Sequence, residues 1–423
     1  MKKRLLAGIL AATMILGLAS CGTNIDPQIQ SKNLMEELEK PTTGDKNPEG
    51  KTLAEYEGLH PLSDFGVRLM QQTLKSAGGD ENVLISPLSV LLALYMTANG
   101  ANGQTKDQMM QVLGKDLNGY LKAYQESLLQ GTDYKLHIAN GIWFKDKESL
   151  KVQEEFLKNN QEYFDATLYK APFDDTTCKE INNWVKENTD DMIDGILDEI
   201  SQDAVLYLIN ALSFDAKWSK PYNEYSVHEN RTFTKEDGTE QKTTLMYSEE
   251  NIYLEDENAI GFMKYYKENK YAFVALLPKD GVSVADYVEW LTADTLQETL
   301  TNAKRTVVNA ALPKFETEYD ILLNDVLVQM GMADAFSATN ADFTKMAVSD
   351  DGNIFISRVL HKTFISVDEL GTKAGAVAAV EMTDECAIVE SYNVYLNRPF
   401  VYMLIDCKTN QPFFIGTMMD VEK

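Results

Sequence analysis

An unbroken apolar run, "AVLYLINALSF", occupies residues 204–214. Strands with one solvated face alternate apolar and polar residues, whereas strands covered on both faces read as continuous apolar runs. This run therefore predicts a central strand of a sheet that is covered on both faces. A second run, "LSVLLALYM" at residues 88–96, is apolar nearly all round, which predicts a helix buried on every side.

Further elements follow from hydrophobic periodicity. Two sets of apolar residues recur at helical spacing, namely Leu62, Phe65, Leu69, Met70 and Leu74, and then Ile181, Trp184, Val185, Met192, Ile193 and Ile196. Five more segments read as strands, at residues 271–277, 306–312, 353–360, 399–405 and 412–419. Helices lead and strands dominate the end, so we expect one large mixed α/β (α+β) body with partly segregated sheets and helices.

The charge of the chain restricts its partners. There are 39 basic and 65 acidic residues, which give a formal net charge of −26. A chain this acidic repels a phosphate backbone, and no basic stripe compensates for it. We therefore expect no nucleic acid partner.

The first twenty residues resemble a signal peptide. A basic start at residues 2–4 precedes an apolar run from Leu5 to Leu18 that is short for a membrane span. The ending "LASC", residues 18–21, resembles a bacterial lipobox, which implies that Cys21 is lipidated and attaches the chain to a membrane. The alternative is a plain secretory signal in which Cys21 is incidental. Residues 21–55 have little apolar periodicity and are expected to form a flexible tether to a folded domain at 56–423.

Signatures of enzymes and metal sites are missing. Four cysteines lack CxxC spacing, so no zinc site is expected: Cys21, Cys178, Cys386 and Cys407. If Cys21 carries lipid, the other three cannot all pair, and no disulfide framework is expected. The sequence has no HExxH or GxSxG motif, and its glycines lack the spacing of a phosphate loop. We therefore expect a protein that is not an enzyme and needs no cofactor.

The stretch "DELGTKAGAVAAVEMTDECAIVE", residues 368–390, combines a ribbon of small residues with an acidic end. In a strand, alternate side chains point to opposite faces. One face would then carry only small or apolar residues, namely Thr372, Ala374, Ala376, Ala378, Val380 and Met382. Such a strand could be buried on one face but need not be. An alanine-rich core helix is the alternative, and Gly371 and Gly375 argue against it.

Nine segments of the chain, from about residue 58 to its end, resemble serpins and occur in the serpin order. They are "NVLISPLSV" (82–90), "NGIWF" (140–144), "INNWVKENTDDMI" (181–193), "LINALSFDAKW" (208–218), "LPKF" (312–315), "MGMADAFS" with "ADFT" (330–344), "VLHKTFISVDELGTKAGA" (359–376), "NRPFVYML" (397–404) and "PFFIG" (412–416). The resemblance implies the serpin fold, with three β-sheets, eight or nine helices and an exposed reactive loop. It also implies a suicide inhibitor of extracellular serine or cysteine proteases, which inserts its cleaved loop into the main sheet and traps the acyl-enzyme.

The resemblance also implies roles for particular residues. The hinge of the loop would comprise Glu369, Gly371, Thr372, Ala374, Ala376 and Ala378. A polar cluster beneath the sheet, the shutter, would comprise Ser86, Ser89, Asn210 and His361. The point where insertion starts, the breach, would comprise Lys314, Trp218 and Glu369. Lys373 departs from the pattern, because inhibitory serpins usually carry an acid there.

The reactive loop, from Glu369 to Pro399, is longer than in many serpins, which leaves several candidate bonds for cleavage. We favour Glu385–Cys386, with Cys386–Ala387 and Ala387–Ile388 as alternatives. An acid before the bond suits a glutamate- or aspartate-selective protease, whereas Ala387 suits an elastase-like one. The expected protein is a monomer that is secreted, lipid-anchored to a bacterial surface or membrane, and forms a covalent acyl complex with its target protease. The alternative is a non-inhibitory serpin that acts as a binding or structural lipoprotein.

Overall fold

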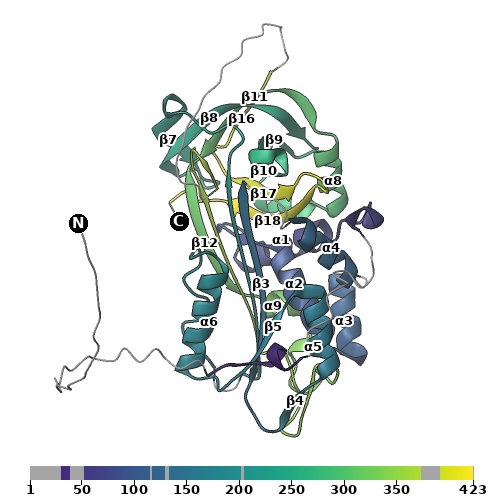
Figure 1. Cartoon of the computed structure of the whole chain (residues 1–423). Helices are drawn as coiled ribbons and strands as arrows, with labels where there is room; N and C mark the ends of the chain where they lie inside the picture. Colours follow the sequence, from purple (N-terminus) through teal and green to yellow (C-terminus); the bar gives the residue numbers. More distant parts are fainter. Residues whose placement is uncertain are drawn as a thin grey trace, which may run out of the picture.

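The central strand of the molecule is β6 (Leu206–Lys217), and only Asp215 and Lys217 in it are not fully buried. The computed structural model describes residues 30–38, 52–114, 117–128, 133–201, 204–372 and 391–422. β6 belongs to a seven-stranded sheet that runs along the length of the molecule (Figure 1). The strand order is β1 (Lys32–Asn33), β5 (Thr167–Ala171), β3 (Tyr134–Lys145), β6, β15 (Gly371–Thr372), β14 (Arg358–Val367) and β12 (Phe315–Leu322). The predicted central strand at 204–214 is confirmed.

A second sheet of nine strands forms the upper part of the molecule (Figure 1). Its order is β16 (Ser391–Tyr395), β11 (Lys304–Pro313), β8 (Glu240–Glu255), β9 (Ala259–Tyr265), β10 (Tyr271–Pro278), β17 (Phe400–Asp406), β18 (Gln411–Met418) and β2 (Leu84–Ile85), with β7 (Val227–Thr234) paired to β8. A small third sheet pairs β13 (Ala347–Ser349) with β4 (Leu150–Val152) at the opposite end. Four of the five predicted strand segments thus lie on strands.

Nine α-helices occur in the described residues. They are α1 (Pro61–Ser76), α2 (Pro87–Ala98), α3 (Gly103–Leu113), α4 (Asn118–Leu128), α5 (Glu154–Phe164), α6 (Asp175–Asn188), α7 (Val284–Trp290), α8 (Ala293–Thr301) and α9 (Asn324–Met330). The prediction of a mixed α/β body with three sheets and eight or nine helices is confirmed. Within the described part of the chain, none of these helices has the length and hydropathy needed to span a bilayer.

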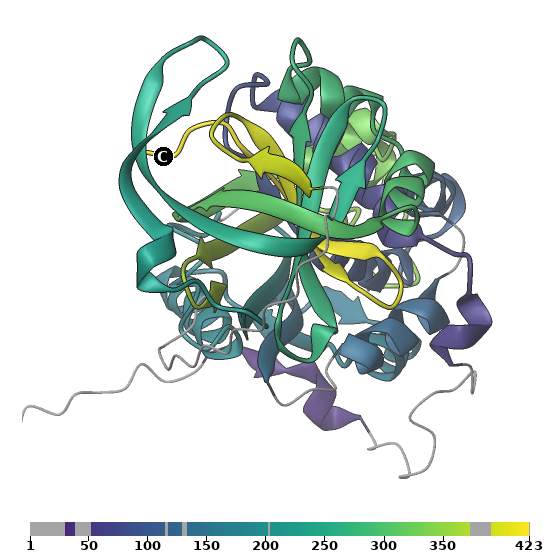
Figure 2. The same ribbon diagram turned by 90° about the horizontal axis from the view of Figure 1, so that it is seen from above.

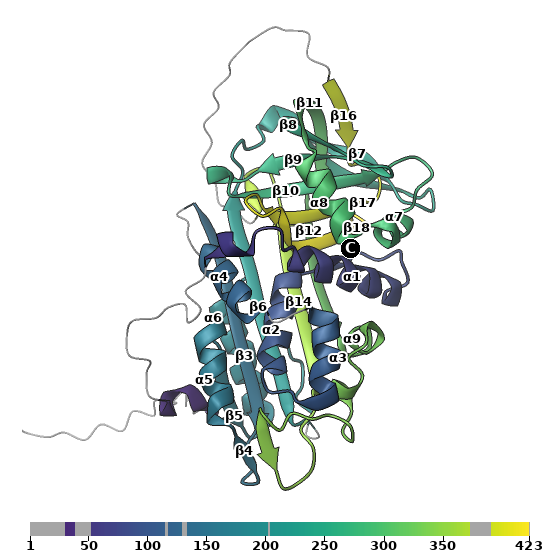
Figure 3. The ribbon, with the colours of Figure 1, turned by 90° about the vertical axis from the view of Figure 1, so that its right-hand side faces the viewer.

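The seven-stranded sheet is covered on both faces, which explains the apolar run in β6. α2 packs behind β6 and β3, and every residue of α2 is buried, as its sequence predicts. Ser86 caps α2 by accepting a hydrogen bond from Ser89 N, and Pro87 occupies the first turn, where its missing N–H costs nothing. On the opposite face, Ile181 and Val185 of α6 pack with Trp143 and Tyr207 of the sheet. Figure 3 shows α2 on the side of the sheet that faces α1 and α3.

Two predicted elements are shorter than their sequence patterns suggest. The helical face that we extended to Ile196 ends with α6 at Asn188, because Asp190 and Asp191 adopt positive φ angles of 54° and 59°. These left-handed conformations interrupt the helical backbone. The strand that we expected from residue 353 begins at Arg358.

Part of the expected tether belongs to the folded body. Lys32 and Asn33 pair with Tyr169 and Lys170 of β5, at the edge of the seven-stranded sheet. Leu34 is buried against the core, where it contributes to the main hydrophobic cluster. The prediction of a flexible tether from 21 to 55 is therefore wrong for residues 30–38, because the apolar residues there have a hydrophobic surface to cover and the edge strand offers backbone hydrogen bonds.

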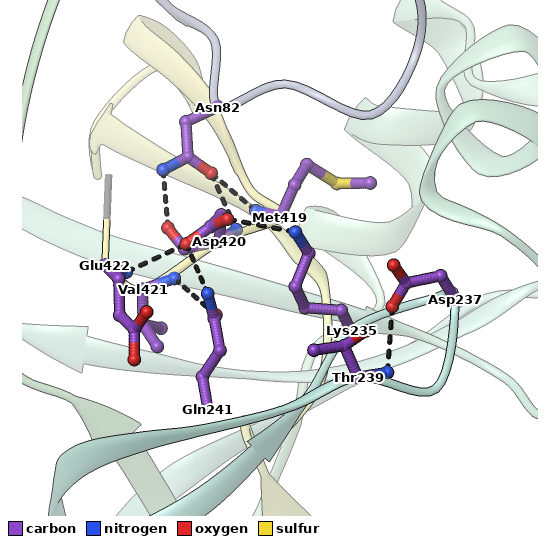
Figure 4. A network of polar contacts seen from close by, with 9 residues as sticks. All are labelled: Asn82, Lys235, Asp237, Thr239, Gln241, Met419, Asp420, Val421 and Glu422. Carbon is purple, nitrogen blue, oxygen red and sulfur yellow. Dashed lines mark hydrogen bonds and ion pairs between the residues drawn. The ribbon is translucent and has the colours of Figure 1, made fainter.

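The carboxyl end of the chain is held by a polar network (Figure 4). Asn82 Oδ1 accepts hydrogen bonds from the backbone N–H groups of Met419 and Asp420, at 2.7 and 3.0 Å. The Asp420 carboxylate accepts from Gln241 Nε2 at 2.7 Å and pairs with Lys235 Nζ at 3.0 Å. The network ties the residues after β18 to the β7–β8 hairpin and to the segment that precedes β2.

Candidate functional site: the opening in the main sheet

The strands β6 and β14 are paired at one end and separated at the other. Three parallel pairs join them, and the last is Leu360 with Ile209. At the other end, β15 lies between them, with Thr372 paired to Ala216 of β6 and to Val367 of β14. Between these two points, residues 210–215 of β6 and 361–366 of β14 do not pair with each other. We call this interval the opening.

The hinge turn brings the chain back into the sheet through residues 368–371. Asp368 Oδ1 accepts hydrogen bonds from the N–H groups of Leu370 and Gly371, at 2.8 and 3.1 Å. A Cβ on Gly371 would lie 2.1 Å from the carbonyl oxygen of Ala216, so any other residue there would push the hinge away from β6. The predicted hinge residue Gly371 therefore has a steric reason for its identity.

The side chain of Thr372 is buried at the entrance of the opening. It is 1% exposed, and its Oγ1 lies 2.6 Å from the hydroxyl of Tyr266. The Tyr266 ring stacks on Trp218 with centroids 4.4 Å apart. Burial raises the pKa of Tyr266 well above its usual value, although the hydrogen bond to Thr372 acts against this rise, so the hydroxyl stays protonated. Sequence reasoning missed Tyr266, because its partner in the hinge is 106 residues away.

Trp218 and the chain that follows it hold the hinge turn through backbone contacts. The Trp218 indole N–H donates to the carbonyl of Asp368 at 2.9 Å, and its backbone N–H donates to the carbonyl of Leu370 at 2.8 Å. Tyr222 N donates to the carbonyl of Glu369 at 2.9 Å. The predicted breach residue Trp218 thus lies directly against the hinge.

Lys314 and Glu369 form the expected pair at the edge of the entrance. Lys314 Nζ lies 2.8 and 3.0 Å from the two carboxylate oxygens of Glu369. Partial burial acts to raise the pKa of Glu369, but the hydrogen bond and charge of Lys314, together with a backbone hydrogen bond, lower it. Both side chains are substantially solvated, so the pair contributes little to stability and mainly fixes the position of Glu369.

A buried ion pair supports Trp218 from behind. Lys264 Nζ lies 2.7 Å from Glu250 Oε1 and 4.2 Å from the centre of the Tyr222 ring. It also lies 5.4 Å from the centre of the Trp218 ring. Burial lowers the pKa of Lys264, and the nearby carboxylate of Glu250 opposes that shift. We did not predict this pair from the sequence, because Lys264 and Glu250 stand on different strands.

Three of the four predicted shutter residues are linked by hydrogen bonds. His361 Nε2 accepts from Ser86 N at 3.0 Å, and Ser86 Oγ accepts from Ser89 N at 3.2 Å. Burial lowers the pKa of His361 to about 4, so its imidazole is neutral at pH 7. A neutral ring is required for this bond, because Nε2 must keep its lone pair to accept.

The fourth shutter residue, Asn210, bonds to a different partner. Its amide nitrogen donates to Asn140 Oδ1 on β3, and Asn140 Nδ2 donates to the carbonyl of Phe164 at 3.3 Å. Asn210 and His361 each follow directly after the last β6–β14 pair, Ile209 with Leu360. Asn210 Oδ1 is buried and accepts no hydrogen bond within the described structure. The shutter therefore lies where the two strands part.

Several predicted residues lie outside the described residues. They are the lipidation site Cys21, the hinge residues Ala374, Ala376 and Ala378, and the candidate bond residues Glu385, Cys386, Ala387 and Ile388. Among the described residues, no group of His, Cys, Asp and Glu side chains is arranged to hold a metal ion.

Comparisons with known proteins agree with this architecture. The sequence model of the family described as Serpin (serine protease inhibitor) matches residues 60–421. Neuroserpin of Homo sapiens is 29% identical over 381 residues, which cover 85% of this chain and 91% of neuroserpin. An uncharacterized serpin-like protein of Thermococcus kodakarensis is 32% identical over 357 residues, covering 81% of this chain and 82% of that protein. The chain belongs to the serpin family, whose members are mostly protease inhibitors.

Two solved structures of one thermophilic serpin, tengpin, are also similar to this chain. The native state is 46% identical, has a TM-score of 0.85, and covers 93% of this chain and 100% of tengpin. The latent state is 48% identical, has a TM-score of 0.75, and covers 85% of this chain and 97% of tengpin. The described body is therefore more similar to the native state of that protein than to its latent state.

Proposed function

We propose that this serpin inhibits extracellular serine or cysteine proteases by inserting its cleaved reactive loop into the opening between β6 and β14. A protease would cut the loop and remain attached through an acyl bond. Insertion of the loop would then carry the enzyme along the sheet and distort its active site before water releases it. Serpin loop insertion is itself one of the known modes of strand addition to a sheet.

The observation that supports this proposal most strongly is the position of Thr372. Its backbone pairs with both β6 and β14, and its side chain is buried. Thr372 therefore already occupies the position between the two strands that the first residue of an inserting strand would take. Because residue 372 is already fixed in the sheet, its loss of conformational entropy precedes insertion, and the following loop residues would add to the sheet one after another.

The pairing register at the entrance determines which residues of β6 the following loop residues would face if they inserted. Gly371 pairs with Lys217 and Thr372 with Ala216, in antiparallel orientation. If the same register continued, Ala374 would stand opposite Phe214, Ala376 opposite Leu212, and Ala378 opposite Asn210. Phe214 and Leu212 belong to the main core, which leaves space only for small side chains on that face.

The same register assigns a place to Lys373, the residue that departs from the serpin pattern. Continued insertion would put Lys373 opposite Asp215 on the other face of the sheet. Asp215 is only partly buried, and opposite charges across a strand pair are favourable. A lysine at this position is therefore compatible with insertion in this chain.

We further propose that the inhibitor is held at a bacterial surface or membrane by lipid on Cys21, where it would meet proteases from outside the cell. Within the loop we propose cleavage at Glu385–Cys386, with Cys386–Ala387 and Ala387–Ile388 as the alternatives. The acidic residue before the first bond suits a glutamate- or aspartate-selective protease. Ala387 suits an elastase-like enzyme.

The test is incubation of the folded domain with a panel of serine and cysteine proteases of different specificity. We expect a complex that survives SDS with at least one protease. Mass spectrometry of the released carboxyl fragment should give Cys386 as its first residue. A first residue of Ala387 or Ile388 would move the bond. Cleavage without any complex across the whole panel would contradict inhibition and favour the non-inhibitory alternative.

A further inference from the structure

A cavity of about 410 Å³ lies next to the residues that follow Trp218. Its walls come from Ser219 and Lys220, from residues 250–252 of β8, from the end of β9, from the start of β11, and from Cys407 after β17. Figure 2 looks down on the nine-stranded sheet, which supplies most of these walls. Small-molecule sites usually have volumes of roughly 300–1,000 Å³, so this cavity is large enough to hold a ligand.

The cavity carries more positive than negative charge, although the chain as a whole is acidic. Lys220, Lys264 and Arg305 line it, and Glu250 is the single carboxylate among its described lining residues. Lys264 Nζ lies 2.7 Å from Glu250 Oε1, so these two charges compensate each other. Lys220 and Arg305 form no ion pair within the part of the chain that the structure describes. Two positive charges are therefore uncompensated here, in a chain with a formal net charge of −26.

A β-bulge determines the direction of Arg305. Arg305 pairs with Ile252 of β8, and the register shifts before the next pair, which is Val308 with Glu250. Arg305 and Val308 are three residues apart and would point to opposite faces of a regular strand. The bulge puts both on one face, because paired residues share a face and both Ile252 and Glu250 are buried there. Bulges of this kind are frequent beside binding sites, where they redirect a side chain.

Other walls of the cavity offer flat and apolar surface. The buried side chain of Ile252 and the half-buried ring of Tyr265 both line it. Burial raises the pKa of Tyr265, and the nearby guanidinium of Arg305 opposes this rise, so the cation lies close to the phenol. Arginine stacks on planar groups as well as pairing with acids. The cavity therefore combines apolar surface with two free cations.

We propose that this cavity binds a small organic dianion, with two carboxylates or one phosphate monoester attached to a flat apolar body. Lys220 and Arg305 would each pair with negative charge on the ligand, and such charge-assisted hydrogen bonds are stronger than neutral ones. The surplus of positive charge would also raise the local concentration of anions at the mouth of the cavity. The site is separate from the reactive loop, so it does not depend on the proposed inhibitory function.

Residues 218–222 connect the cavity to the hinge. On the side of the cavity, the carbonyl of Lys220 accepts a hydrogen bond from Lys264 Nζ at 3.1 Å. On the other side, the backbone N–H groups of Trp218 and Tyr222 donate to carbonyls of the hinge turn. A dianion bound to Lys220 would restrict the motion of this segment, and with it the N–H groups that hold the hinge.

The first test is calorimetric titration of the uncleaved protein at pH 8 with isophthalate and with phenyl phosphate. We expect saturable binding of at least one of them, and no binding of isophthalamide, which has the shape of isophthalate without its charge. Lys220→Gln and Arg305→Gln should each raise the Kd about tenfold, as expected for the loss of a hydrogen bond between charged groups. The matched control is Lys242→Gln, an exposed lysine of β8 outside the cavity, which should leave the Kd unchanged.

A second test follows backbone hydrogen exchange by mass spectrometry. The dianion that binds should slow exchange in residues 218–222 of the wild type and leave β13, at the opposite end of the molecule, unchanged. At the same concentration it should have a much smaller effect on Arg305→Gln. Binding of isophthalate alone would assign the site to dicarboxylates, and binding of phenyl phosphate alone to phosphate monoesters. Absence of binding by both, or equal Kd values in wild type, Lys220→Gln and Arg305→Gln, would overturn the site, and unchanged exchange in 218–222 on binding would contradict its link to the hinge.

Discussion

The hydroxyl of Tyr266 and Oγ1 of Thr372 lie 2.6 Å apart, and both side chains are buried. Tyr266 follows directly after β9 of the nine-stranded sheet, whereas Thr372 ends the described part of the hinge. The bond joins the upper sheet to the first residue that enters the opening in the main sheet. It therefore acts as a latch that keeps the start of the loop inserted.

Removal of the latch should slow insertion. Tyr266→Phe deletes one hydroxyl and leaves Thr372 Oγ1 buried without its partner, at a cost of about 1–3 kcal/mol. The hinge would leave the sheet more often, so more acyl-enzyme would be hydrolysed before insertion. We expect more serpin molecules consumed per protease trapped, and an altered Trp218 fluorescence, since Trp218 stacks on Tyr266. Tyr265→Phe, one residue earlier, is the control, and an equal effect there would contradict the latch.

The shutter should respond to pH through His361. Burial lowers its pKa to about 4 from an ordinary value of 6.5, so the folded protein favours the neutral ring. Above pH 6.5, His361 is neutral in both the folded and the unfolded state, and the free energy of unfolding does not depend on its titration. As the pH falls from 6.5 towards 4, the unfolded chain binds a proton that the folded protein does not, so the free energy of unfolding decreases. The full loss corresponds to about 3 kcal/mol, at 1.36 kcal/mol for each pKa unit.

The measurement is the free energy of unfolding of the wild type and of His361→Gln between pH 7.5 and 4.5, for which we expect the two curves to converge as the pH falls. Gln can accept the hydrogen bond from Ser86 but does not titrate. A constant difference between the curves across this range would mean that His361 is not the titrating group.

The carboxyl end of the chain should depend on Asn82. Asn82→Ala leaves the N–H groups of Met419 and Asp420 without their side-chain acceptor in a buried place. We expect the free energy of unfolding to fall by about 2–3 kcal/mol, since unsatisfied buried donors are costly. Asn251→Ala, at an exposed position of β8, serves as the control and should change stability by less than about 0.5 kcal/mol. If Asn82→Ala lowers the free energy of unfolding no more than this control does, the network does not stabilise the carboxyl end.

The anchor can be tested by fractionation of cells. Cys21→Ser removes the thiol that the lipobox-like sequence "LASC" offers for lipid attachment. We expect the wild type in the membrane fraction and the variant in the soluble or secreted fraction. Fractionation of the variant with membranes, as for the wild type, would contradict lipid anchoring at this residue.

Much of this molecule could be predicted from the sequence. Long apolar runs specified β6, α2, β10 and β17, because burial on all sides leaves a continuous pattern in the sequence. The resemblance to serpins placed Lys314 beside Glu369 and Ser86 beside His361, and the structure brings both pairs into hydrogen-bond distance.

Other features depend on contacts between distant segments and leave no local pattern. The latch residue Tyr266 and the buried pair Lys264 and Glu250 are of this kind, since each partner lies on a different strand. The sequence of residues 30–38 resembles that of a linker. These residues join the folded body because Lys32 and Asn33 pair with the edge strand β5, which the sequence does not reveal. The resemblance to serpins groups Asn210 with the other shutter residues, but its amide nitrogen donates to Asn140, directly opposite it on β3.

The account as a whole depends on insertion of the hinge between β6 and β14, and Thr372→Arg tests this most directly. Arginine at this buried position would place a charge where burial costs several kcal/mol unless it is paired. The loop should still be cut, because the candidate bonds lie more than ten residues away. Thr372→Ser, which keeps a small hydroxyl side chain, is the matched control.

The decisive quantity is the yield of SDS-resistant complex per serpin molecule cleaved. Wild type and Thr372→Ser should give mainly covalent complex, whereas Thr372→Arg should give mainly cleaved serpin and active protease. The cleaved wild type should also melt at a much higher temperature than the intact protein, because the inserted strand completes the sheet. Equal yields of complex from wild type and Thr372→Arg would contradict the insertion mechanism for this chain.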